Sequence, residues 1–297
     1  MKRLLLSLLL WLPIYAYAAL NVFACEPEWG ALVREIGGNA VKVYTATTAL
    51  QDPHRIEARP SLIAQMRRAD LVVCSGADLE AGWLPVLLRE AGNARVQPGL
   101  PGLFEATRFV ALLEKPASLD RSQGDLHAAG NPHIHTDPRN LARVGAALAA
   151  RMAELDPPSA AVYQAQWQAF SARWSEAIVR WELRAKPLKG LPVAVQHKSF
   201  SYLLAWLGMK EVVTLEPKPG VEPSVSHLAR VATQLQTTPA RAVLRAGYQS
   251  PRPANWLAER TGIPALALPY TVGGSERAQD LFGLFDDTLD QLLRVAP

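Results

Sequence analysis

One long helical run limits what this chain can fold into. Between two proline-containing boundaries, residues 159–186 carry large apolar side chains at steps of three or four, so that they fall on one face of a helix: Tyr163, Trp167, Phe170, Trp174, Ile178 and Trp181. A helix of that length, at about 1.5 Å per residue, is roughly 42 Å long. We therefore predict a spine between two lobes, with its aromatic stripe turned toward a core rather than toward a cofactor.

The segments on both sides of this run alternate between strands and helices with short loops, which indicates parallel βαβ units. We predict strands at 20–24, 41–44, 70–74, 191–195, 211–215, 242–244 and 265–268. The helices between them are expected up to Gly37 and over 60–68, 138–155, 202–207, 225–236, 253–261 and 278–295. The predicted fold class is α/β, with two lobes that each contain a parallel sheet flanked by helices. An N-terminal lobe (19–157) and a C-terminal lobe (188–297) would be joined by the long helix (158–187).

The first 18 residues have the layout of a secretory signal. Lys2 and Arg3 precede an apolar run over 4–14, and Ala16 and Ala18 form a cleavage site of the A-x-A kind. The run is shorter than the roughly 20 residues that a membrane-spanning helix needs, which argues against an uncleaved anchor. We expect cleavage of this signal and a periplasmic mature protein. Loss of Lys2 and Arg3 lowers the formal net charge from +4 to +2, and this small excess, without a basic run containing aromatics, argues against a nucleic-acid partner.

Two cysteines, Cys25 and Cys74, remain in the mature chain. Both fall at the carboxyl ends of predicted strands that could be neighbours. In an oxidising compartment they could form a disulfide, and the alternative is a pair of buried free thiols. The sequence leaves both possibilities open.

Three of the six histidines follow strands or close a long loop. His54 follows the second strand, His133 ends a turn-rich loop of about 20 residues, and His197 follows the first strand of the C-terminal lobe. In parallel α/β sheets, ligands bind outside the carboxyl ends of the strands. Two lobes that face each other would bring these histidines together, and three imidazoles are enough to bind a transition metal ion such as zinc.

Several motifs in combination give the chain a family resemblance. They are the secretion signal, the DPH of 52–54, the run RPSLIAQMRRADLVVCSGADLEAGWLP, the segment NPHIHTDPRN, the long helix and HKSFSYL. Together they resemble the ZnuA/TroA-like solute receptors of bacterial zinc and manganese ABC importers over nearly the whole mature chain. The resemblance implies two α/β lobes joined by one long helix. It also implies metal binding by the histidines at the matching motif positions, which are His54, His133 and His197.

The chain departs from the family where a fourth ligand is expected. Members of the family commonly supply an Asp from a turn after the last strand, but here that region reads ALPYTVGGSE, without an acid before Glu276. Water, Asp52, Glu222 and Glu276 remain candidates for the fourth position.

The other three histidines are given supporting or surface roles. The short GDLH segment, with Asp125 and His127, is expected to be a surface loop, although it could also hand metal to the site. His135 is expected to hydrogen-bond a metal-binding residue rather than bind metal itself. His227 lies inside a predicted helix, at the surface or between the lobes.

These features predict a monomeric periplasmic receptor that captures Zn²⁺ as its transported ligand and delivers it to a membrane ABC permease. Neutral imidazoles suit zinc, whereas a manganese site is expected to contain more carboxylate. One alternative is a zinc enzyme, because three histidines and a water also form a hydrolytic site. The sequence contains neither HExxH nor G-x-S-x-G, and we predict no catalytic residues. The other alternative is a receptor for a metal chelate of the siderophore type, which would need an open cleft.

Overall fold

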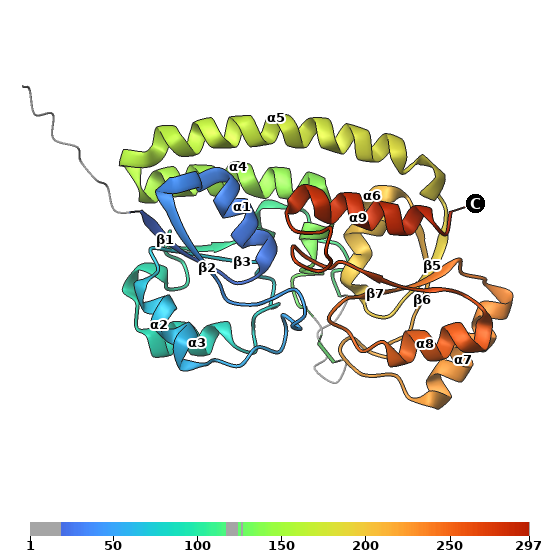
Figure 1. Cartoon of the computed structure of the whole chain (residues 1–297). Helices are drawn as coiled ribbons and strands as arrows, with labels where there is room; N and C mark the ends of the chain where they lie inside the picture. The colour runs from blue at the N-terminus through green and yellow to red at the C-terminus, as the bar shows by residue number, and fades with distance from the viewer. Residues whose placement is uncertain (1–18, 117–123, 126, 297) are drawn as a thin grey trace, which may run out of the picture.

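The computed structural model describes residues 19–116, 124–125 and 127–296. Two parallel four-stranded sheets lie next to each other, and one long helix runs across both (Figure 1). The predicted signal segment, residues 1–18, falls outside the described residues. No helix in the described part of the chain is both long and apolar enough to cross a membrane.

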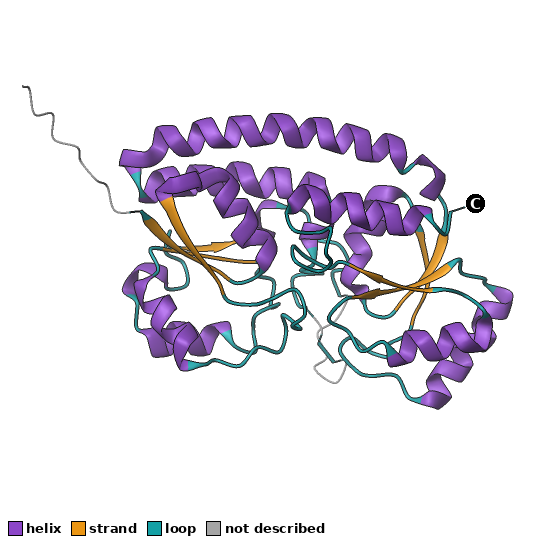
Figure 2. Ribbon diagram, in the orientation of Figure 1, coloured by secondary structure: helices purple, strands orange, loops and turns teal. Residues whose placement is uncertain are grey.

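The N-terminal lobe contains the first sheet, whose strands run in the order β2-β1-β3-β4. All its neighbouring strands pair in parallel: β1 (Leu20–Ala24), β2 (Val41–Thr45), β3 (Leu71–Cys74) and β4 (Leu103–Glu105). Four helices flank this sheet: α1 (Pro27–Gly37), α2 (Pro60–Arg68), α3 (Leu84–Ala91) and α4 (Pro138–Leu155). Helices α1 and α4 lie on the side of the long helix, and α2 and α3 cover the opposite side (Figure 2).

The C-terminal lobe repeats this arrangement with the strand order β6-β5-β7-β8. Its strands are also parallel: β5 (Pro192–Val195), β6 (Lys210–Thr214), β7 (Ala242–Ala246) and β8 (Ala265–Leu268). Its helices are α6 (Ser201–Leu207), α7 (Val225–Thr237), α8 (Arg252–Thr261) and α9 (Leu281–Leu293). Helices α6 and α9 lie toward the long helix, and α7 and α8 lie on the far side (Figure 2).

The long helix is α5, Ala160–Arg184, and it spans both lobes as predicted. Its aromatic stripe is buried, with Tyr163, Phe170, Trp174 and Trp181 almost inaccessible to solvent. Gly145 of α4 lets the two helices approach closely, because a Cβ there would lie 2.3 Å from the ring of Trp167. The spine therefore packs through large aromatic side chains rather than through a flexible linker.

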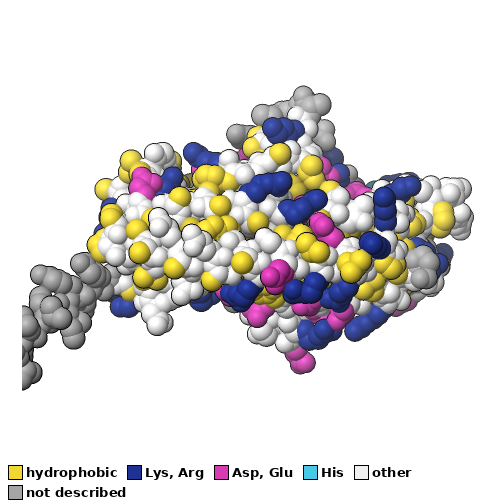
Figure 3. Space-filling model, turned by 90° about the horizontal axis from the view of Figure 1, so that it is seen from above, with side chains coloured by type: hydrophobic (Ala, Val, Ile, Leu, Met, Phe, Trp, Pro, Cys, Tyr) yellow, Lys and Arg dark blue, Asp and Glu magenta, His cyan; other side chains and the backbone are white. Residues whose placement is uncertain are grey.

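Ion pairs attach α5 to a helix of each lobe. Arg173 binds Glu35 of α1 at 2.8 Å, and Arg184 binds Asp286 of α9 at 2.6 Å. The face of the molecule that carries α5 shows Lys and Arg side chains scattered among apolar and acidic ones (Figure 3). These contacts, together with the aromatic stripe, hold the two lobes against one continuous support.

The hydrophobic core consists of one cluster shared by both lobes and one smaller cluster in each lobe. One hydrophobic cluster runs through both lobes beneath α5 and includes residues of both sheets. Two smaller clusters lie on the opposite faces of the sheets, one under α2 and α3 and the other under α7 and α8. The predicted fold class is confirmed, and the sequence analysis missed only the short elements α3 and β4 among the helices and strands listed above. Strand β4 has three residues, too few to show an alternating pattern.

A disulfide joins Cys25 and Cys74. Cys25 directly follows β1 and Cys74 ends β3, and these strands are neighbours in the first sheet. Their Cα atoms are 4.8 Å apart. Of the two alternatives that the sequence left open, the structure has the disulfide.

Candidate metal centre

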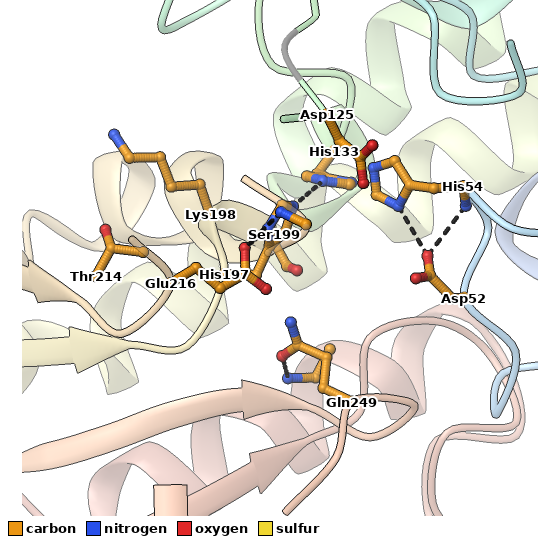
Figure 4. Close-up of polar contacts among 12 residues, drawn as sticks. Asp52, His54, Asp125, His133, His197, Lys198, Ser199, Thr214, Glu216 and Gln249 are labelled. Atoms are coloured by element: carbon orange, nitrogen blue, oxygen red, sulfur yellow. Dashed lines mark hydrogen bonds and ion pairs between the residues drawn. The ribbon is translucent and has the colours of Figure 1, made fainter. Parts of the chain in front are cut away.

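The three predicted histidines lie together where the two lobes meet. His54 is in a turn after β2, His197 comes two residues after β5, and His133 precedes a short 3-10 turn that leads into α4. Their candidate ligand atoms all lie within 4.8 Å of one another. Figure 4 shows the three rings pointing toward a common centre. The convergence that we expected from the strand ends is therefore present.

The closest contact in this group crosses from one lobe to the other. Nε2 of His133 and Nε2 of His197 are 3.3 Å apart. Two nitrogens bound to one zinc ion at about 2.0–2.1 Å and at a tetrahedral angle would lie about 3.3–3.4 Å apart. The third ring, His54, lies 5.3 Å from His133 and 5.6 Å from His197 between centroids. The spacing of His133 and His197 already suits a shared ion.

Each of the three rings is held at its other nitrogen. The partners of the Nδ1 atoms are Asp52 for His54 at 2.8 Å, Tyr270 for His133 at 2.7 Å and Glu216 for His197 at 2.7 Å. A proton on Nδ1 that is donated to such an oxygen leaves the lone pair of Nε2 free for a metal ion. Figure 4 shows Asp52 and Glu216 behind their rings, on the side away from the centre. This orientation of the three rings is the one that histidines need in order to bind a metal ion through Nε2.

Burial affects the pKa values of His133 and of two residues that contact the histidine rings. It lowers the pKa of His133 well below its usual value, and the positive charges that His54 and His197 could carry lower it further. Burial also raises the pKa of Tyr270 well above its usual value, so that its hydroxyl keeps its proton. For Asp52, burial raises the pKa, but hydrogen bonds from His54 outweigh it and the net shift is downward. An ionised carboxylate that accepts a hydrogen bond from the far nitrogen of a metal-binding histidine strengthens that ring as an electron donor.

Neighbouring polar groups fix His133 between the lobes. The side-chain oxygen of Asn131 accepts the His133 backbone N–H at 2.9 Å, and its amide nitrogen donates to the Lys198 carbonyl at 2.8 Å. His135 lies outside the three-histidine group and donates from Nε2 to the Tyr270 carbonyl at 2.9 Å. It therefore supports the residue that holds His133, one contact farther from the three histidines than we predicted.

A buried contact between the lobes lies behind His135. Its Nδ1 is 3.1 Å from a carboxylate oxygen of Glu28 in α1. The Thr271 hydroxyl of the C-terminal lobe donates to the other oxygen of Glu28. All three side chains are buried. The position of Tyr270, and through it the ring of His133, thus depends on groups from both lobes.

The candidates for a fourth ligand differ in their positions. Asp52 holds the Nδ1 of His54, which is the position of a supporting group. Glu222 is exposed and lines the cleft beside the histidines, and Glu276 is exposed after β8 and does not line that cleft. The cleft has a volume of about 220 Å³ and is lined by, among others, His54, His197, Glu216, Tyr248 and Gln249.

His127 lies closer to the centre than a surface loop would place it. Its Nε2 is 3.3 Å from Nε2 of His54, and the two ring centroids are 5.3 Å apart. The expectation of an ordinary surface position was therefore wrong for this residue. His227 lies in α7, half-buried, and contacts Arg230 rather than the three-histidine group.

Sequence reasoning named Asp52 but missed the other two residues that hold the rings. Glu216 lies two residues after β6, and Tyr270 lies two residues after β8. Both positions are at carboxyl ends of parallel strands, where ligand-binding residues concentrate. That position was the available signal, and it applied to these residues as much as to His54 and His197.

Comparisons with known proteins identify the family of this chain. A sequence model of the family described as "ZnuA: Zinc-uptake complex component A periplasmic" matches residues 22–295. The metal ABC transporter substrate-binding lipoprotein SloC of Streptococcus mutans is 21% identical, over 94% of this chain and 93% of that relative. The high-affinity zinc uptake system protein ZnuA of Bacillus subtilis is 24% identical, over 77% of this chain and 71% of that relative.

Solved structures show the same fold. A crystal structure of ZnuA has a TM-score of 0.76 and 21% identity, covering 93% of this chain and 98% of that chain. The substrate-binding protein FpvC from Pseudomonas aeruginosa, in complex with Mn²⁺, has a TM-score of 0.80 and 22% identity, with the same two coverages of 93% and 98%. On the match of the family model over almost the whole described chain, the protein belongs to the ZnuA family, whose members are metal-binding receptors of ABC transporters and not enzymes.

Proposed function

We propose that this chain captures Zn²⁺ outside the cytoplasm with His54, His133 and His197, and that it delivers the ion as a monomer to a membrane ABC permease. The observation that carries the proposal is the 3.3 Å separation between Nε2 of His133 and Nε2 of His197, which come from different lobes. A single ion between them would hold the two lobes together. Binding and lobe position would then be coupled, as a receptor that reports its loaded state requires.

Zinc is favoured over manganese by the chemistry of the donors. Three imidazoles form a neutral donor set, and the nearest carboxylates, Asp52 and Glu216, accept hydrogen bonds from Nδ1 atoms. Manganese prefers carboxylate, carbonyl and water oxygens, and it binds mixed sites less tightly than zinc does. Relatives of both kinds exist, because one similar protein is named a manganese transporter component and another a zinc uptake protein.

The size of the cleft supports a bare ion rather than a chelate. Its volume of about 220 Å³ is below the roughly 300–1,000 Å³ that is typical for organic ligands. The histidines also lie against one another, so a bulky chelate would have to separate them. A hydrated or bare ion needs no such opening.

The test is a metal titration of chelator-treated mature protein. We expect one Zn²⁺ per chain, tighter binding of Zn²⁺ than of Mn²⁺ in competition with a chromophoric chelator, and loss of tight binding in His197→Ala. His227→Ala is the matched control and should bind as the wild type does. Tighter binding of Mn²⁺ would make this a manganese receptor, and failure to bind either ion would refute the proposal.

A further inference from the structure

The Nε2 atoms of His127 and His54 have the same separation as the Nε2 atoms of His133 and His197. In both pairs the two Nε2 atoms are 3.3 Å apart. This separation is that of two nitrogens on one tetrahedral zinc ion, about 3.3–3.4 Å. The four rings thus form two pairs, and His54 connects them because its ring also lies 5.3 Å from that of His133.

The ring of His127 faces the ring of His54 with the atom that would bind a metal ion. The Nε2 atoms of the two rings lie next to each other. A neutral imidazole has a lone pair on one ring nitrogen, so two facing Nε2 atoms can offer two lone pairs at the same place.

The segment that carries His127 contacts the C-terminal lobe and contains a hydrogen-bonded turn. The Asp125 N–H donates to the Pro219 carbonyl of the C-terminal lobe at 2.9 Å, and the Gly130 N–H donates to the His127 carbonyl at 3.1 Å. Gly220 has a φ of +73°, and a Cβ there would lie 1.9 Å from the Asp125 carboxylate. Only glycine fits so close to this segment, so the contact between Asp125 and the turn at 219–220 is built into the sequence.

None of the four acids near the cleft named below is placed as a fourth metal ligand. Asp52 and Glu216 hold Nδ1 atoms of His54 and His197. Asp125 lies 3.6 Å from the guanidinium of Arg55. Glu222 is exposed where it lines the cleft. Of these acids, only Asp52 and Glu216 are placed to balance the charge of an ion, from behind its ligands rather than in place of one.

We propose that His127 is the fourth ligand of the metal ion, so that the site consists of four imidazoles. This inference rests on the proposed function, because it names a further ligand of the same site. The His127 and His133 rings are 6.2 Å apart, farther than the 5.4 Å between His133 and His197, so His127 moves inward when the ion binds. The donor set is neutral, and Asp52 and Glu216 supply the nearest compensating charge through His54 and His197.

His127 would connect the bound ion to the segment that contacts the C-terminal lobe. A ligand that follows the contact between Asp125 and Pro219 ties this segment to the ion as well as to the C-terminal lobe. Release of the ion then requires His127 to withdraw. Removal of the ring should therefore accelerate dissociation of Zn²⁺ more than it changes association, since affinity differences at one site appear mostly in dissociation rates.

The experiment uses Co²⁺ as a spectroscopic probe and Zn²⁺ for affinity, with full mature protein. Wild-type protein loaded with Co²⁺ should show the intense visible absorption of a four-coordinate ion, and zinc X-ray absorption should give four nitrogen neighbours. In His127→Ala the cobalt absorption should change, and the zinc ion should lose one imidazole neighbour. The affinity for Zn²⁺ should fall by about 100-fold or more. Loss of a residue that only supports a ligand typically costs about 10- to 100-fold.

Two further variants separate the alternatives. Asp125→Asn tests the other ligand candidate of the same segment and should leave both spectra unchanged, and His227→Ala controls for the loss of a histidine elsewhere. Unchanged affinity and spectra in His127→Ala, or a change in Asp125→Asn instead, would overturn the role of His127 while leaving the three-histidine receptor intact. A wild-type protein that binds no Zn²⁺ would refute the proposed function itself, and the fourth ligand with it.

Discussion

Glu216 accepts a hydrogen bond from Nδ1 of His197 across 2.7 Å, and the same carboxylate oxygen accepts the backbone N–H of Gly220 at 2.8 Å. One acid thus sets the orientation of the His197 ring and anchors the turn that contacts Asp125. Its loss should act on the metal site without removing any ligand.

We predict that Glu216→Gln weakens Zn²⁺ binding by about 10- to 100-fold, the usual effect of removing an outer partner of a metal-binding histidine. The amide can present its N–H₂ to Nδ1 and so favour the tautomer whose Nε2 carries the proton. Competition with a chelator measures the affinity. Glu222→Gln, at an exposed acid of the same cleft, should bind zinc as the wild type does. Equal losses in both variants would mean that general charge, and not the contact with His197, matters.

Tyr270→Phe tests the support of His133. The change removes the hydroxyl that lies 2.7 Å from Nδ1 and leaves a buried polar nitrogen without that partner, at a cost of about 1–3 kcal/mol in the free energy of unfolding. Zinc affinity should fall as well, because the ring loses its orientation. Urea unfolding and metal titration measure the two effects.

The matched control for this variant is Tyr248→Phe. Tyr248 is another tyrosine of the cleft, and its hydroxyl lies 3.4 Å from that of Ser199, a weaker contact. It should change stability and affinity less than Tyr270→Phe. A Tyr270→Phe protein with wild-type affinity would show that His133 is oriented by its backbone alone.

A buried acid pair near the disulfide predicts a pH dependence of stability. Burial and the nearby charges of Glu80 and Glu28 raise the pKa of Glu26 well above its usual value, and burial raises the pKa of Glu80 to about 7. The folded protein therefore holds protons that the unfolded chain releases above about pH 4.5. The contribution of this pair to the free energy of unfolding is fully present at low pH and is lost as the pH rises toward 7. The loss is at most about 1.4 kcal/mol per pH unit for each proton.

Glu26→Gln replaces the protonated acid by a neutral group of the same shape. The stability of the variant relative to the wild type should increase as the pH is raised from 5 to 7. The difference between the two unfolding curves is the quantity to measure, because the depressed pKa of His133 gives the opposite slope in both proteins. A difference that stays constant with pH would contradict the protonation of Glu26.

The disulfide between Cys25 and Cys74 closes a loop with a sequence separation of 49. Its removal in the double variant Cys25→Ala, Cys74→Ala should lower the free energy of unfolding by about 2–4 kcal/mol, mainly because the unfolded chain gains freedom. Urea unfolding with and without a reducing agent measures the effect. The reducing agent should destabilise the wild type and leave the double variant unchanged, and equal sensitivity of both would argue against the bond.

Much of the fold could be read from the sequence because the signals were local. The spacing of Tyr163, Phe170, Trp174 and Trp181 predicted α5, and the strand–helix alternation predicted both sheets. We selected His54, His133 and His197 because each follows a strand or closes a loop, where parallel sheets bind ligands, and the structure brings the three together. These inferences needed only the order of elements along the chain.

The rest of the site depends on contacts between distant segments. Tyr270 lies 137 residues from His133 along the chain, so no local pattern links them. The position of His127 depends on the contact of Asp125 with Pro219 in the other lobe, and a short polar segment gives no sign of such a contact. Long-range partners and loop positions therefore stayed outside what the sequence could predict.

The central claim is that one zinc ion is bound between the lobes by histidines of both. A crystal of the zinc-loaded protein, measured on both sides of the zinc absorption edge, tests it most directly. We predict a single anomalous peak at about 2.0–2.1 Å from Nε2 of His54, His133 and His197. A peak away from these three nitrogens, or none between the lobes in a protein that retains its zinc, would contradict the account.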